Sequence, residues 1–232
     1  VGNSIFDGAI SGTGGMVKNG AGSLTLGGAN LFSGGVALNG GALVVGNNAA
    51  LGSGALTVGS NATLDASTGV SLANSINLAS GANLDLLGSQ ALTLGGVISG
   101  TGGLIKDGAA TVTLSGANTY TGGTTINSGT LAIGAGGSLA ATGAVNLAGA
   151  GTFDISAGNQ AIGSLAGVAG STVALGGSTL TLGGTVDSTF SGAISGNGGL
   201  VKNGAGVQTL NGASTFSGGV ALNAGGLVVG NN

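Results

Sequence analysis

One segment occurs three times in this chain, and it constrains the fold more than any other feature of the sequence. No residue is inserted or lost within a copy, and the copies span residues 11–46, 99–134 and 195–230. Equivalent positions differ by 88 between the first two copies and by 96 between the last two, and this register is marked by Lys18, Lys106, Lys202, Asn39, Asn127 and Asn223. Such a repeat predicts one supersecondary unit stacked on its neighbours rather than a single globular core.

Each copy contains short runs in which apolar and polar residues alternate between glycines. In the first copy these runs are residues 23–26, 36–39 and 43–45. Alternation places successive side chains on opposite faces of a strand. We therefore expect Leu26, Leu38 and Leu43, with their counterparts in the other copies, to point into the interior, and Thr25 to face solvent.

Glycine pairs separate these runs and are typical of corners, where a positive φ or a close backbone approach is needed. Short strands joined by such corners predict an all-β coil in which each turn pairs in parallel with the next. Division of either offset into four coils gives roughly 22 to 24 residues per coil, a size expected of solenoid units. The chain would then hold about ten coils and be on the order of 50 Å long, with the three lysines four coils apart.

The repeat also resembles a known family. The matching residues of the second copy are G-G-L-I-K-D-G-A (102–109), T-V-T-L-S-G-A-N (111–118) and T-Y-T-G-G-T-T-I-N-S-G-T-L (119–131). These resemble the autotransporter-associated β-strand repeat, also called the passenger-associated transport repeat. The resemblance implies a right-handed parallel β-helix in the surface-exposed passenger of a Gram-negative autotransporter. It also implies an extracellular or cell-surface location, with outer-membrane anchoring through parts not in this chain.

The stretches between the copies also consist of short alternating runs separated by glycines. We expect a single solenoid over residues 1–232, with repeats at 5–48, 92–134 and 189–232 and solenoid spacers at 47–91 and 135–187. Residues 5–48 and 189–232 share 33 identities over 44 positions. This near-identity suggests a window of a longer fibre, or a unit that self-associates end to end or side by side.

Composition excludes several other classes. The 56 glycines occur without any proline, which excludes collagen, and 42% hydrophobic residues with a net charge of −3 argue against disorder. The chain has no cysteine, so it can form no disulfide. Polar residues and glycine interrupt every apolar run before it could span a membrane, so we expect no membrane insertion by this segment.

Candidate chemistry is sparse, because the chain has no His, Arg or Glu. The spacing between Asp65 and Asp85 is close to one coil, so the two could lie one above the other as a carboxylate pair, whereas Asp154 has no partner nearby in the sequence. We favour the simpler interpretation that these residues end strands, and we predict no catalytic residue. The six aspartates are dispersed and form no calcium motif, so no metal and no cofactor are expected.

The lysines are the only cations, and at the expected spacing they cannot form a phosphate-binding stripe, so nucleic acid is excluded. We expect each to lie at a solvated corner. Three aromatic residues either cover corners or offer sugar-stacking surface contacts, namely Phe32, Tyr120 and Phe216. Thr-x-Thr pairs are too few for a continuous threonine ladder. Gln208 replaces Leu24 and Val112 at an interior position and needs hydrogen-bond partners there.

The sequence thus favours a structural function: a rod segment of a secreted or surface-displayed adhesin or autotransporter passenger, and not an enzyme. One alternative is a module that binds cell-surface glycans or mediates cell–cell self-association. A second alternative is a polysaccharide-degrading β-helix enzyme.

Overall fold

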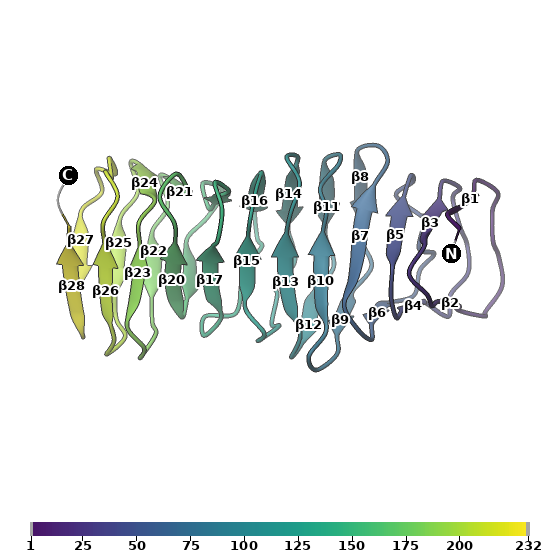
Figure 1. Ribbon diagram of the computed structural model, residues 1–232, viewed down its shortest axis with the longest axis horizontal. Coiled ribbons are helices and arrows are strands. Elements are labelled where there is room, and N and C mark those ends of the chain that lie inside the picture. Colours follow the sequence, from purple (N-terminus) through teal and green to yellow (C-terminus); the bar gives the residue numbers. More distant parts are fainter. Residues whose placement is uncertain (1, 231–232) are drawn as a thin grey trace.

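The computed structural model describes residues 2–230, and these form a three-sided coil of short strands without any helix. Figure 1 shows the coils stacked along one long axis, with the N-terminus at one end and the C-terminus at the other. Every strand pairing recorded between named strands is parallel, as each turn returns above the last. The prediction of an all-β parallel β-helix is therefore confirmed, with about eleven turns rather than ten.

Three faces make up each coil, and the chain passes from face 1 to face 2 to face 3. Face 1 is an unbroken twelve-stranded sheet. Its strands, in order, are β1 (Ser4–Phe6), β3 (Ser23–Leu26), β5 (Ala42–Val45), β7 (Ala62–Ala66), β10 (Asn83–Leu86), β13 (Gly103–Lys106), β15 (Thr124–Ile126), β17 (Ala144–Leu147), β20 (Ser164–Gly167), β23 (Ser188–Phe190), β26 (Val207–Leu210) and β28 (Gly226–Val229).

Face 2 is a seven-stranded sheet formed by β8 (Val70–Leu72), β11 (Leu92–Leu94), β14 (Thr111–Leu114), β16 (Thr130–Ile133), β18 (Thr152–Asp154), β21 (Thr172–Gly176) and β24 (Ala193–Gly196). Face 3 begins with a five-stranded sheet of β2 (Met16–Lys18), β4 (Val36–Leu38), β6 (Leu56–Val58), β9 (Ile76–Leu78) and β12 (Ile98–Gly100). It ends with a four-stranded sheet of β19 (Gln160–Ile162), β22 (Leu180–Leu182), β25 (Leu200–Lys202) and β27 (Val220–Leu222). Less regular backbone joins these two sheets, including a single parallel bridge between Ala117 and Ser138.

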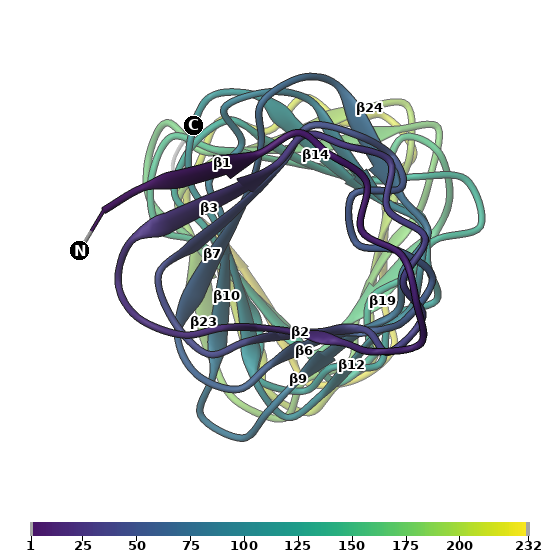
Figure 2. The ribbon, with the colours of Figure 1, turned by 90° about the vertical axis from the view of Figure 1, so that its right-hand side faces the viewer.

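The winding is right-handed. In Figure 2, seen from the N-terminal end, the chain runs clockwise as it recedes from the viewer. The step from one coil to the next is not constant. On face 1 the longest step is that from Gly167 to Phe190, and the shortest are the equal steps from Leu24 to Leu43 and from Gln208 to Leu227. Most steps are shorter than the coil length that the repeat offsets predicted.

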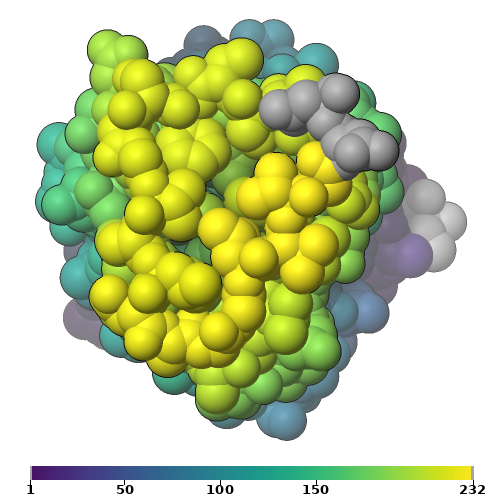
Figure 3. Space-filling model, turned by 90° about the vertical axis from the view of Figure 1, so that its left-hand side faces the viewer, coloured from purple at the N-terminus to yellow at the C-terminus, as the bar shows by residue number. Residues whose placement is uncertain are grey.

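The core is a narrow aliphatic column. Leu26, Leu38 and Leu43 are at most 1% exposed, which confirms their predicted interior positions. Thr25 precedes Leu26 on the opposite side of the same strand and is half-buried on the outer surface. Full burial of a leucine side chain is worth about 1.5–3 kcal/mol, so stacked aliphatic rows supply most of the stability. The space that looks open between the ribbons of Figure 2 is filled by side chains at the end of the rod seen in Figure 3.

Glycine at the corners allows adjacent coils to approach closely. Gly35 has a φ of 78°, and a Cβ placed there would lie 2.6 Å from the carbonyl oxygen of Ala55 in the next coil. Gly41 has a φ of 68°, and its Cβ would lie 2.5 Å from the carbonyl oxygen of Gly20 in the preceding coil. Both the backbone conformation and the contact therefore require glycine.

The repeat does not coincide with a whole number of coils, and the expectation of four coils per offset is wrong. Lys18 lies on face 3, in β2, whereas Lys106 lies on face 1, in β13. Lys202 returns to face 3, in β25. A typical step, such as that from Leu84 to Leu104, is shorter than a quarter of the first offset. That offset therefore carries the motif past four turns and onto the next face.

Gln208 is 1% exposed and its amide is fully bonded, as its interior position requires. Its Oε1 accepts a hydrogen bond from Oγ of Ser188, its register partner in the preceding coil, at 2.7 Å. Its Nε2 donates to the carbonyls of Leu165 and Thr209, each at 3.1 Å. A residue of the neighbouring coil thus supplies one of the hydrogen-bond partners that the sequence analysis predicted for Gln208.

The equivalent residues Leu38 and Leu222 give a direct test of the core. Leu38 is fully buried under the next coil, whereas Leu222, in β27, is 52% exposed. We expect Leu38→Ala to lower the free energy of unfolding by about 2–5 kcal/mol, and Leu222→Ala by about 1 kcal/mol or less. Urea unfolding of the two variants measures the difference. Equal losses would contradict the assigned coil order.

Candidate functional site

The lysines of the repeat bind backbone carbonyls at corners of the coil. The side chain of Lys18 points inward from β2, on the same side of the strand as Met16, and is 8% exposed. Its Nζ donates to the carbonyls of Asn19 at 3.2 Å, of Gly20 at 2.8 Å and of Gly40 at 3.0 Å. Since Gly40 belongs to the next coil, the ammonium joins two successive corners.

The second copy repeats this arrangement on face 1, and the third copy repeats the bond to its own corner on face 3. Lys106 is completely buried, and its Nζ donates to the carbonyls of Asp107 at 2.5 Å, Gly108 at 2.8 Å and Ser128 at 3.3 Å. Lys202 is 3% exposed and donates to the carbonyl of Gly204. The expectation of solvated lysine corners is therefore wrong. In G-L-I-K the lysine stands two residues after the inward-facing Leu104, and this spacing was the signal for its inward position.

The register asparagines complete each corner. Nδ2 of Asn39 donates to Oδ1 of Asn19 at 3.0 Å, in the preceding coil. The same bond joins Asn127 to Asp107 at 2.6 Å, and Asn223 to Asn203 at 2.7 Å. We call each set of lysine, following residue and later asparagine a corner clamp: Lys18–Asn19–Asn39, Lys106–Asp107–Asn127 and Lys202–Asn203–Asn223. The sequence interpretation missed the middle residue, although it always follows the lysine directly.

A second polar residue serves another corner of each copy. Asn30 is 2% exposed; its Oδ1 accepts from the backbone N–H of Ile10 at 2.7 Å, and its Nδ2 donates to the carbonyl of Ala50 at 2.6 Å. Asn118 likewise accepts from the N–H of Ile98 at 2.8 Å. In the third copy Ser214 takes this role, with a bond of 3.2 Å from Ile194. Asn30 thus links three successive coils, and Ser214 links two.

The aromatic residues are not surface platforms. Phe32 and Tyr120 are 2% and 3% exposed, so the predicted surface contact is wrong for both, while Phe216 is partly buried against the core. Burial raises the pKa of Tyr120 to about 12, and its hydroxyl bonds Oγ1 of Thr124 at 2.6 Å. These rings cover corners, which was the other interpretation of the sequence.

The carboxylates do not form the pair that hydrolysis would need. Asp65 is turned to Ser89, whose backbone N–H and Oγ donate to it at 2.9 and 2.6 Å. Asp85 stands opposite Thr63 rather than Asp65, because the register of β7 and β10 places Asp65 two residues further along. Asp154 accepts from the N–H of Ser156 at 2.8 Å. Asp65 and Asp154 are thus held by their own local hydrogen bonds, and neither is directed at Asp85.

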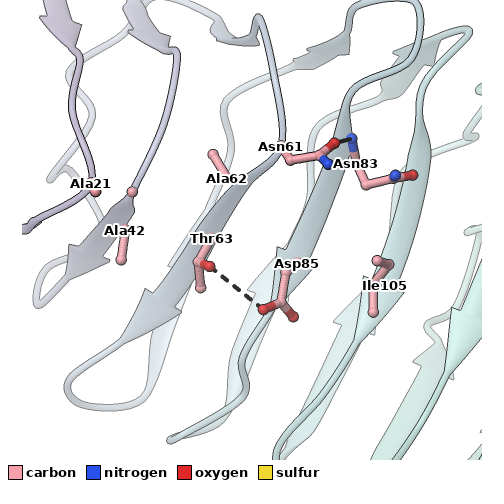
Figure 4. A pocket seen from close by; sticks show the side chains of 9 residues that line it. Ala21, Ala42, Asn61, Ala62, Thr63, Asn83, Asp85 and Ile105 are labelled. Atoms are coloured by element: carbon pink, nitrogen blue, oxygen red, sulfur yellow. Dashed lines mark hydrogen bonds between the residues drawn. The ribbon is translucent and has the colours of Figure 1, made fainter.

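The surface offers two features of possible use in binding. A shallow groove of about 400 Å³ crosses face 1, and Thr63, Asn83 and Asp85 line it beside small alanines (Figure 4). On face 2 the outward side chains of four consecutive coils are threonines: Thr111, Thr130, Thr152 and Thr172. The sequence interpretation missed this row because its members lie one coil apart in the sequence rather than in Thr-x-Thr pairs.

Two other kinds of site are absent from the described residues 2–230. No group of three or more His, Cys, Asp or Glu side chains gathers there in a way that could hold a metal ion. No helix there is long and apolar enough to cross a membrane.

Replacing Lys106 by methionine tests the corner clamp. The substitution keeps the apolar stem but leaves three corner carbonyls without their charged donor, so we expect a loss of about 1–3 kcal/mol in the free energy of unfolding. Burial lowers the pKa of Lys106, and the nearby carboxylates of Asp107, Asp85 and Asp65 partly offset this. A stability equal to the wild type would mean that the cost of burying the ammonium cancels its bonds. Asn146→Ala, at an exposed position of face 1, is the control.

Comparison with known proteins agrees with this geometry. The family model described as "passenger-associated-transport-repeat" matches residues 16–45, 104–133 and 200–229. Each match contains one corner clamp together with its flanking strands. No curated protein and no solved structure matched the chain. The chain therefore carries three copies of the passenger-associated-transport-repeat, which is consistent with an autotransporter passenger repeat protein.

Proposed function

We propose that this chain is a structural rod segment of a surface-displayed autotransporter passenger, anchored in the outer membrane through parts not in this chain. The observation that carries the proposal is the unbroken twelve-stranded ladder of face 1, which runs through all three repeats and both stretches between them. The strands of each coil pair only with those of the coils directly before and after it, so additional coils add length without changing the cross-section.

The corner clamps support a mechanical role. In a thin aliphatic column, polar corner groups would be left without partners if neighbouring coils separated, and a buried unpaired polar group costs about 1–3 kcal/mol. Each clamp makes its own corner depend on the next coil. Separation of neighbouring coils is then opposed by these hydrogen bonds, on faces 1 and 3, as well as by apolar packing.

The same architecture supports folding outside the cell. Every strand forms on the edge of the preceding coil, so a chain that emerges gradually can add one coil at a time. The absence of cysteine means that this folding requires no disulfide exchange. The chain carries only nine formal charges, and the lysines among them are buried.

Removing one coil tests the rod. Leu56 pairs with Ile76, so deletion of residues 56–75 removes one complete turn and joins equivalent positions. We expect this variant to keep its strand content by circular dichroism and to be shorter by about 4.8 Å in small-angle scattering. Deletion of residues 56–65, half a turn, is the matched control and should disrupt folding because it moves later strands to the wrong face. Equal behaviour of the two deletions would contradict the proposal.

We propose glycan binding as a second candidate function, favoured by the threonine row of face 2. Four stacked strands offer hydroxyl and methyl groups at the regular strand spacing of about 4.8 Å. Such an array suits an ordered polysaccharide better than the buried aromatic residues do. We expect Thr130→Val with Thr152→Val to reduce binding on a glycan array at least tenfold, with Thr25→Val on face 1 as the control. Unchanged binding, or no binding by the wild type, would remove this candidate.

No observation on the described residues favours the enzymatic alternative. Self-association end to end or side by side stays a prediction, which the molar mass in solution over a range of concentrations would test.

A further inference from the structure

Asp85 is a surface carboxylate with one oxygen buried and without a partner. It lies in β10 between the buried Leu84 and Leu86, so its side chain points outward into the groove of face 1 (Figure 4). Its Oδ2 accepts a long hydrogen bond of 3.5 Å from Oγ1 of Thr63, in the preceding coil. Its Oδ1 is buried and has no hydrogen-bond partner. A buried acceptor of this kind needs a donor.

A second carboxyl lies diagonally across from Asp85 on the next coil. Asp85 pairs in register with Ile105, and Asp107 follows two residues later, at the end of β13. Burial raises the pKa of Asp85, and the charge of Asp107 and a side-chain contact between the two carboxyls raise it further. Asp107 also accepts, through Oδ1, a hydrogen bond of 2.6 Å from Nδ2 of Asn127. Two ionised carboxylates in this position repel each other, whereas one shared proton turns the contact into a hydrogen bond.

No other charged group nearby relieves this contact by direct bonding. The ammonium of Lys106 is aimed at the carbonyls of its corner clamp. Asp65, on the β7 side, adds further negative charge and is itself held by Ser89. The remaining neighbours on the strands beside Asp85 are the neutral Thr63 and Ile105.

We propose that Asp85 and Asp107 form a carboxyl–carboxylate pair that holds one proton and makes the central coils of face 1 more stable in mildly acidic than in neutral solution. Only the second repeat supplies a carboxyl at this place, because Asn19 and Asn203 occupy the place of Asp107 in the other copies, whereas Asp85 comes from the stretch that precedes the repeat. The inference does not depend on the proposed function.

The direction of the pH dependence follows from linkage. Burial, followed by the charge of Asp107, raises the pKa of Asp85 to about 6 from an ordinary value of 3.8. The folded protein therefore binds this proton more tightly than the unfolded chain does between these two values. The stability that this proton contributes is greatest where both states are protonated, declines as the pH rises from about 4, and levels off once the pH has passed the folded pKa near 6.

Thermal melting from pH 4 to pH 8 tests the proposal. We expect the melting temperature of the wild type to fall by several degrees between pH 5 and pH 7. Asp85→Asn should remove this fall. Asp107→Asn, which restores the residue of the other two copies, should reduce it, because burial still raises the pKa of Asp85 in that variant. Asp187→Asn is the control and should retain the fall in melting temperature. Asp187 is exposed, and an asparagine there keeps the Oδ1 acceptor that binds the backbone N–H of Val207.

A direct titration separates this result from a general effect on folding. The carboxyl carbon of Asp85, followed by NMR, should shift with a midpoint near pH 6 in the wild type and at least one pH unit lower in Asp107→Asn. A midpoint near 4 in the wild type, or a melting profile of Asp85→Asn that still falls between pH 5 and pH 7, would overturn the proposal.

Discussion

The fold depends on satisfying corner polar groups between one coil and the next. A column this narrow can bury aliphatic rows such as Leu26 and Val45, but three corners in every coil also bring backbone groups away from water. The carbonyl of Gly40 is one of these groups, and it accepts its bond from a side chain of the preceding coil. The corner clamps and the buried asparagines, Asn30 and Asn118, supply such donors between adjacent coils. Parallel stacking therefore stabilises both the strands and the turns between them.

This constraint explains how the repeat can change faces. A corner clamp requires one strand, the corner that follows it and the same corner one coil later, and faces 1 and 3 both offer this combination. Lys18 on face 3 and Lys106 on face 1 therefore make equivalent bonds although their surroundings differ. The motif is tied to the local strand and corner geometry, so its period need not match the coil. Coils of unequal length are then tolerated between one copy and the next.

The sequence predicted the parts of the structure that follow from alternation and from glycine. The interior positions of Leu26, Leu38 and Leu43 follow from the side-chain period of a strand, and the coil follows from strands joined by glycine corners. The face of each repeat could not be obtained this way, because a small error in the coil length accumulates over four coils until the motif lies on another face. The threonine row of face 2 stayed hidden for the same reason: Thr130 and Thr152 become neighbours only when the coil length is known.

The buried lysines show where a general expectation about charge misled the sequence interpretation. A lysine on a corner is usually solvated, but here the strand alternation places it inside, and the backbone carbonyls of two coils replace water around its ammonium. Carbonyls satisfy the charge without any carboxylate, so the residue after the lysine is free to vary between asparagine and aspartate. The second copy uses that freedom: Asp107 still accepts from Asn127 as Asn19 does from Asn39, and its added charge raises the pKa of Asp85 beyond the effect of burial. The middle residue of a corner clamp can therefore be a titratable aspartate while the hydrogen bonds of the clamp to the next coil remain in place.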